Sequence, residues 1–310
     1  MTTIASFPYL GIGFALLSAA LLTVGNHLQS LGVAARVRAN PGAGAAALWT
    51  LARQPSWLIG SVLFGLAILA QLAALAFAPL MVVQPVGVAA LVFSSLLTAV
   101  ITRTPPRLGE IGAIVLSVVS LGVFVLVAAA VSTQATITDA QLIAVLAVLG
   151  VVLAATGAAF AVRRGRGLRA GGYVILGGLF SGFVATLGKT VILRVQTAVA
   201  GADYRLDENN LLTLACLLAI VVAGALSITF VQIAHTVASP QLVVAGLTVV
   251  DPFVAVVMGI TVLGEAAGAP AWSFVVFVLA GAGALAGVWL LARSGGATDA
   301  AVDAASARVT

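Results

Sequence analysis

The stretch "SGFVATLGKTVILRVQ" (Ser181–Gln196) is apolar over most of its length, yet Lys189 lies near its middle. In a soluble protein this lysine would simply extend to water. In a membrane helix, a lysine at mid-depth costs about 2.5–3.5 kcal/mol and therefore needs a partner, water or a function. The fold class depends on which of these two surroundings the rest of the chain provides.

The composition of the chain argues against a soluble fold. Of its 310 residues, 62% are hydrophobic and 7% are charged, whereas about 25% of the residues of a soluble domain are charged. The net charge of +5 is scattered along the chain, without the basic face that nucleic-acid binding needs. A single cysteine, Cys216, excludes a disulfide framework. These features predict an integral membrane protein.

Nine apolar stretches are long enough to cross a bilayer, which takes about 20 residues of helix. The sequence therefore predicts an all-α integral membrane protein with nine transmembrane helices. After Arg293 the chain is rich in Ala, Ser and Asp, which predicts a disordered tail over 294–310. The predicted spans are Leu10–Ala35, Trp57–Phe77, Val82–Ile101, Leu108–Ala130, Leu142–Val162, Tyr173–Ala198, Leu211–Ala234, Leu242–Val262 and Trp272–Leu291.

The arginines of the loops predict the orientation. They gather in the loops that follow the first, third and fifth spans, whereas the loop "GADYRLDENN" (Gly201–Asn210) on the opposite side is net acidic. Because cytoplasmic loops carry the excess of Lys and Arg, we expect the N-terminus outside the cell and the C-terminus in the cytoplasm. The expected location is the plasma membrane, which the chain crosses many times.

Two segments five spans apart share a pattern. In "SAALLTVGNHLQ" (Ser18–Gln29) and "SGFVATLGKTVI" (Ser181–Ile192), Ser, Thr and Gly recur at equal spacing, and Asn26 falls opposite Lys189. Such segments cross the membrane in opposite directions, so the match predicts an inverted repeat, which is common in secondary transporters. We expect a 5+4 arrangement, with a first repeat of four spans over 1–138, a linking fifth helix and basic loop over 139–171, and a second repeat over 172–293.

The chain resembles the drug/metabolite transporter superfamily (EamA-like), and in particular its nine-span, NIPA-like branch. The segments that carry the resemblance are "NHLQSLG" (Asn26–Gly32), "AALAFAPLMVVQPVGVAALVFSSLLTAVI" (Ala73–Ile101), the lysine at 189 and "VLGE" (Val262–Glu265). The loop "TRTPPRLGE" (Thr102–Glu110) departs from the pattern, because relatives tend to carry a glutamate closer to the helix end. The resemblance implies export of a small metabolite or drug-like solute, and for the NIPA-like branch transport of magnesium.

Lys189 and Asp251 are the ionisable residues predicted deep inside spans, whereas Glu265, just beyond the eighth span, is expected to be a solvated loop charge. The rise of a helix places Lys189 and Asp251 about 10 Å apart along the membrane normal, so a direct pair requires tilt or unwinding near Pro252. One hypothesis is a buried salt bridge without a role in transport. The other is an aqueous cavity in which Lys189 binds an anionic group of the substrate and Asp251 binds a proton or a cation.

A polar stripe on the first span supplies further candidates for substrate binding. Thr23, Asn26 and Ser30 follow helical spacing, with Gln29 beside them, and Gln71 lies alone in the second span. Such side chains also join membrane helices by hydrogen bonds, so both roles stay open. The predicted substrate-binding set is Thr23, Asn26, Gln29, Gln71, Lys189 and Asp251.

The predicted function is secondary transport of a small metabolite or drug-like solute by alternating access, with an anionic solute favoured by Lys189. One alternative is a magnesium transporter in which Asp251 contacts the ion, although Mg²⁺ prefers one or two carboxylates and Lys189 would repel it. The other is a non-transporting scaffold that presents lipids to a partner enzyme. No nucleophile–base pair and no phosphate-binding loop occurs, so we expect no enzyme activity and no cofactor. The expected partners are a solute, a coupled proton or cation, and the bilayer.

Overall fold

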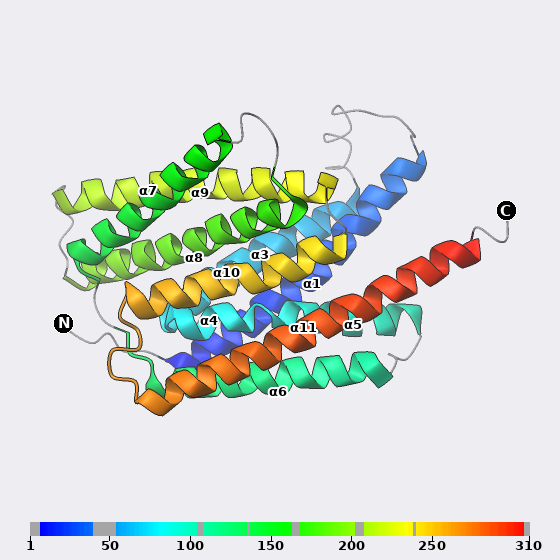
Figure 1. The fold of residues 1–310 in the computed structure, drawn as a ribbon, viewed down its shortest axis with the longest axis horizontal. Helices are drawn as coiled ribbons and strands as arrows, with labels where there is room; N and C mark the ends of the chain where they lie inside the picture. The colour runs from blue at the N-terminus through cyan, green and yellow to red at the C-terminus, as the bar shows by residue number, and fades with distance from the viewer. Residues whose placement is uncertain are drawn as a thin grey trace.

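The computed structural model describes residues 7–39, 54–103, 108–134, 137–162, 168–201, 208–237 and 240–306, and within these ranges every regular element is a helix. Most helices lie along the long axis of the molecule, and α7 crosses them at an angle (Figure 1). The helices are α1 (Pro8–Ala39), α3 (Pro55–Phe77), α4 (Leu80–Val86), α5 (Ala89–Thr102), α6 (Leu108–Val131), α7 (Asp139–Val162), α8 (Ala170–Gly201), α9 (Glu208–Val237), α10 (Pro240–Thr261) and α11 (Ala271–Ser306).

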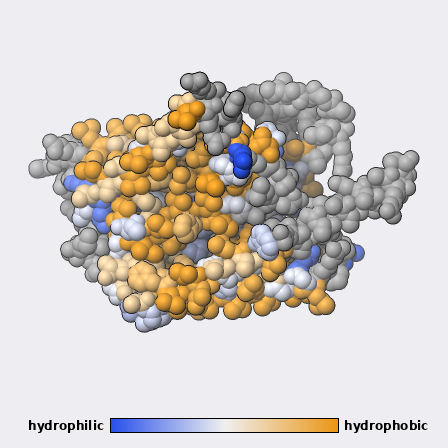
Figure 2. All heavy atoms as spheres, viewed as in Figure 1, coloured by the Kyte–Doolittle hydropathy of each residue, from blue (hydrophilic) through white to orange (hydrophobic). Residues whose placement is uncertain are grey.

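The exterior of the bundle is apolar. Large hydrophobic side chains are exposed on helices throughout the described ranges, among them Leu69, Val221 and Val278, and hydrophobic residues make up most of the coloured part of the face in Figure 2. An apolar surface of this extent is not found on a soluble monomer. In the described ranges, eight helical segments are long and apolar enough to cross a membrane. The prediction of an all-α, multi-pass membrane protein is confirmed.

One feature at the C-terminal end differs from the expected spans. The last helix, α11, continues to Ser306, although the sequence predicted a disordered tail from residue 294. The alanines of that segment favour helix over other conformations. Residues 307–310 lie outside the described ranges.

The third predicted span is broken into two helices. In the predicted span Val82–Ile101, Pro85 would lie in the first turn, but the structure places it inside α4, directly before the helix ends. Pro85 has no N–H to donate, and just beyond it the backbone changes to tighter bonds: the Gly87 N–H donates to the Gln84 oxygen and the Val88 N–H to the Pro85 oxygen, both at 3.1 Å. A turn therefore separates α4 from α5 inside the bundle.

Small residues bring α8 and α10 close together. A Cβ atom added to Gly178 would lie 2.7 Å from the Val250 side chain, and one added to Gly182 would lie 2.7 Å from Val254. Close approach through small residues is a usual way for membrane helices to associate. This contact brackets Asp251 and fixes its position against α8.

The pair of α6 and α11 packs in the same way, side by side along the edge of the bundle (Figure 1). A Cβ atom at Gly287 of α11 would contact the Ser117 side chain of α6 and would lie 2.9 Å from the Ala113 backbone oxygen. Four residues earlier, Gly283 lies equally close to Ser120 of α6. The spacing of the two glycines is the small-xxx-small pattern of membrane helix pairs.

We expect Gly287→Val to destabilise the protein by roughly 1–3 kcal/mol, because the added side chain meets the backbone of α6 and must push the two helices apart. Thermal unfolding of the purified protein in detergent measures the effect. Gly281→Val on the same helix is the matched control, since nothing lies within 4 Å of a Cβ atom there. Equal melting temperatures for the two variants would contradict this packing role.

Candidate functional site

Lys189 lies on α8, and its side chain is fully buried. Its Nζ donates hydrogen bonds to the carbonyl oxygens of Leu75, at 2.5 Å, and Ala78, at 2.7 Å, where α3 ends. The last carbonyls of a helix have no donor within the helix and form the negative end of its dipole. The ammonium therefore caps α3, and the two carbonyl acceptors offset part of the cost of burying its charge.

The neighbouring carbonyls at the end of α3 also have donors. The Nε2 atoms of Gln134 and Gln196 donate to the Ala76 oxygen at 3.4 and 3.1 Å. The Phe7 N–H donates to the Phe77 oxygen at 3.0 Å. The donors come from the segment before α1, from the link after α6 and from α8. Distant parts of the chain therefore meet at this helix end and hold it in place.

Glu265 caps the first turn of α4, the helix that follows α3. Its carboxylate oxygens accept the N–H groups of Leu80 at 2.6 Å and Met81 at 2.8 Å, the first residues of α4, and a negative charge at this helix end is favourable. The side chain is only 4% exposed, so the expectation of a solvated loop charge is wrong. Burial raises the pKa of the Glu265 carboxyl, while the Lys189 ammonium and the two N–H donors oppose that rise.

The two charges hold the link between α3 and α4 from opposite sides. We name Lys189 and Glu265 the charge clamp. Both belong to the second half of the chain, whereas the link, Ala78 and Pro79, belongs to the first half. Their opposite charges attract each other, and each also faces the helix end of opposite polarity. The clamp thus joins the two halves of the chain at one end of the bundle.

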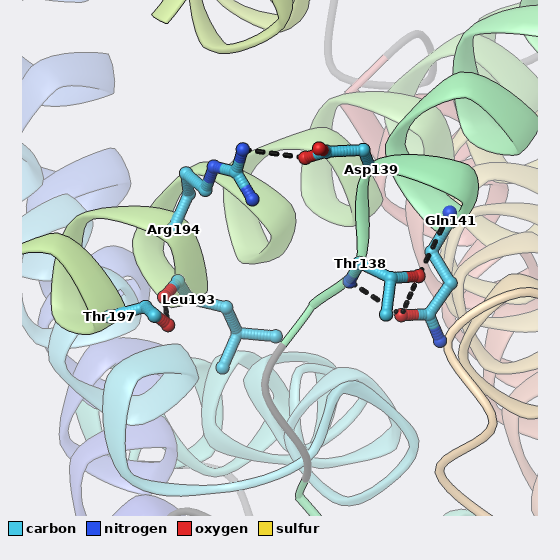
Figure 3. Close-up of polar contacts among 6 residues, drawn as sticks. All are labelled: Thr138, Asp139, Gln141, Leu193, Arg194 and Thr197. Carbon is cyan, nitrogen blue, oxygen red and sulfur yellow. Dashed lines mark hydrogen bonds and ion pairs between the residues drawn. The ribbon is translucent and has the colours of Figure 1, made fainter. Parts of the chain in front are cut away.

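Figure 3 shows further polar contacts, at the start of α7. Arg194 of α8 pairs with Asp139 at 2.6 Å, and Thr138 and Gln141 form a capping box, with the Thr138 N–H donating to the Gln141 Oε1 at 2.9 Å. The Gln141 Nε2 in turn donates to the Leu263 oxygen at 3.0 Å. The start of α7 therefore steadies the link after α10 that carries the acidic half of the charge clamp.

A cavity of about 380 Å³ lies among α1, α3, the junction of α4 and α5, and α10. Its volume falls within the range of small-molecule sites. Both halves of the chain form its walls, and most of the lining is apolar. The lining residues with polar side chains are Ser18, Gln71, Gln84, Thr248 and Asp251. Of the described residues that line it, Asp251 alone is ionisable.

One oxygen of the Asp251 carboxylate accepts a hydrogen bond, and the other accepts none from the described residues. The Ser181 hydroxyl donates to Oδ2 at 2.7 Å, whereas Oδ1 is buried and accepts no hydrogen bond from the described part of the chain. A buried carboxylate oxygen without a donor is costly. Pro252, the next residue along α10, also lines the cavity and has no N–H.

The predicted substrate-binding residues separate into two groups. Gln71 and Asp251 line the cavity. Thr23 and Gln29 join helices, because the Thr23 hydroxyl lies within hydrogen-bond distance of an α5 carbonyl and the Gln29 Nε2 bonds to a serine of α3. Asn26 is exposed on α1. The assignment of this second group to substrate stays a prediction.

The position of Lys189 differs from both hypotheses drawn from the sequence. It does not line the cavity, and its ammonium faces the carbonyls of α3. Among the described residues, Lys189 and Asp251 form no ion pair; the pair that forms is Arg194 with Asp139. The buried lysine therefore donates to backbone carbonyl oxygens, and the pattern of side chains in the sequence cannot predict such acceptors.

Three polar residues of the cavity, Ser18, Gln84 and Thr248, were not among the predicted substrate-binding residues. The Ser18 hydroxyl also donates to the Ala67 oxygen at 2.8 Å. A signal for Gln84 exists, since it directly precedes a proline inside a helix, as Asp251 does. No protein-family model, no curated protein and no solved structure matches this chain, so the family resemblance stays a prediction.

Proposed function

We propose that the protein is a secondary transporter whose solute occupies the cavity among α1, α3, α4, α5 and α10. The observation that carries the proposal is Asp251, an ionisable residue that lines a solute-sized, mostly apolar cavity and has a buried carboxylate oxygen without a hydrogen-bond donor among the described residues. Ionisable groups inside membrane spans are costly, and they are typical of substrate and ion pathways. A scaffold without such a pathway has no need to keep this carboxylate.

An inverted 5+4 repeat supports alternating access as the mechanism. The close pair of α1 and α3 in the first half corresponds to the close pair of α8 and α9 in the second half, and α6 packs against its counterpart α11. Thr23 and Thr186, which are equivalent in the repeat, each donate to the carbonyl oxygen four residues earlier at 2.8 Å. Secondary transporters bind their substrates between such halves, and residues of both halves of this chain line the cavity.

The proposed topology has nine spans, with α4 and α5 forming the third and α10 the eighth. The N-terminus would lie outside the cell and the C-terminus in the cytoplasm, across the plasma membrane. In this orientation the charge clamp lies at the outer end of the bundle. The arginines at 103 and 169 lie near the inner end, as the positive-inside rule requires.

Transport into vesicles tests the proposal. The full-length protein in liposomes should give saturable uptake of at least one solute from a panel of radiolabelled cationic, neutral and anionic metabolites, and protein-free liposomes should give none. A magnesium-sensitive dye inside the same vesicles tests the first alternative. Magnesium entry that needs Asp251, without uptake of any organic solute, would replace the proposal. Folded protein that carries neither would contradict transport and favour a scaffold.

A further inference from the structure

We propose that the cavity binds a monovalent organic cation, with the positive charge against Asp251 and an apolar body against α1 and α5. The inference rests on the proposed function for its purpose. Binding itself, however, can be measured in the purified protein without any transport. It reverses the expectation of an anionic solute that the sequence raised.

The described lining of the cavity lacks a positive side chain that could pair with Asp251. The lining of the cavity contains no Lys, Arg or His side chain among the described residues. Asp251 receives one hydrogen bond, from the neutral hydroxyl of Ser181, and its Oδ1 receives none. A carboxylate in a low-dielectric interior needs a nearby positive charge or a proton. The described walls supply no positive charge, so either a proton or a cationic ligand must complete the site, and a cavity of about 380 Å³ has room for the ligand.

Two basic residues that could serve an anion site, Lys189 and Arg194, already have partners. The Lys189 ammonium donates to two carbonyls of α3 and interacts with the buried Glu265. The Arg194 guanidinium pairs with Asp139 at the start of α7. An anionic solute would therefore enter a cavity that presents a carboxylate and no available positive charge, and like charges repel strongly at low dielectric.

The single carboxylate and the volume of the cavity limit the charge and the size of the cation. One carboxylate neutralises one positive charge, so a divalent ion would keep an uncompensated charge inside the membrane. A bare alkali ion would leave most of the 380 Å³ unfilled. The apolar wall, which includes Ala15, Ala19, Leu22 and Leu91, suits a hydrocarbon or aromatic body. The amides of Gln71 and Gln84 remain for a polar substituent.

Equilibrium binding to the purified full-length protein in detergent tests the inference with four probes: benzyltrimethylammonium, benzyl alcohol, benzoate and Mg²⁺. The first three share an aromatic ring and differ in charge, and the ammonium keeps its charge at every pH. We expect the cation to bind about tenfold or more tighter than the alcohol, and benzoate not to bind. Tighter binding of benzoate, equal binding of cation and alcohol, or no binding of the cation would overturn the inference.

Two matched variants locate the charge. Asp251→Asn keeps an oxygen for Ser181 and should lose about tenfold or more in affinity for the cation. Asp139→Asn removes a carboxylate that lies outside the cavity and should bind the cation as the wild type does. Unchanged affinity in Asp251→Asn would overturn the inference. Cation binding without any vesicle flux would keep it and contradict transport, whereas flux restricted to anions or neutral solutes would keep transport and overturn it.

Discussion

Lys189→Met should destabilise the folded protein by about 3–5 kcal/mol, because removal of one partner leaves the other charge buried and uncompensated. Methionine keeps a flexible apolar side chain in place of the lysine stem, so little volume is lost. What disappears is the ammonium, and with it the donors to Leu75 and Ala78. Glu265, at 4% exposure, then remains as an isolated charge.

Thermal or denaturant unfolding in detergent measures this loss, and a double-mutant cycle identifies its cause. Glu265→Gln alone should also destabilise the protein, since Lys189 then lacks its counter-charge. The double variant should lose clearly less than the sum of the two single losses, because no isolated charge remains. Arg194→Met is the control for the same end of the bundle, since it breaks a partly exposed pair that is worth at most about 1 kcal/mol. Additive losses, or a wild-type melting temperature for Lys189→Met, would contradict the charge clamp.

Asp251→Asn should have the opposite pattern, with loss of transport and no loss of stability. We expect solute flux to fall about thirtyfold or more, since removal of a buried charged partner costs about 2 kcal/mol or more in binding. The Asn oxygen can still accept from Ser181, and a buried charge without a counter-ion disappears, so the melting temperature should stay equal or rise. Flux into liposomes and thermal unfolding, measured on one preparation, check both effects.

The control for this variant is Asp139→Asn, which changes the same functional group at the surface of the bundle. It should keep wild-type flux, because its carboxylate contacts Arg194 and does not line the cavity. Flux that survives Asp251→Asn would remove Asp251 from the solute pathway. A large drop in melting temperature would instead indicate that the carboxylate stabilises the fold.

The sequence was sufficient for the class of fold, because membrane spans follow from composition alone. Long apolar stretches predicted the helices, and the cost of a charge in lipid marked Lys189 and Asp251 as residues that need an explanation. The sequence could not supply the partner of Lys189, because every residue has a carbonyl and only the tertiary fold shows which helix end lies nearby. The sequence therefore left the lysine between a salt bridge and a substrate site, whereas the structure places its ammonium against backbone carbonyls.

The burial of Glu265 could not be predicted for a related reason. A glutamate after a span reads as a loop charge, and whether a loop folds back into the bundle depends on contacts with distant helices. Pro85 shows the same limit on a smaller scale. Its missing N–H was readable from the sequence, but whether the helix would kink, shift or stop depends on the neighbours that accept the altered backbone. The cavity beside it is a property of that packing.

The most direct test of the division of roles between the charge clamp and Asp251 is solute flux per folded molecule in two purified variants. We assign the charge clamp to the fold and Asp251 to the solute. The double variant Lys189→Met/Glu265→Gln, although less stable, should carry solute at nearly the wild-type rate per folded molecule, while Asp251→Asn should carry almost none. Flux that is lost in the double variant and kept in Asp251→Asn would contradict this assignment.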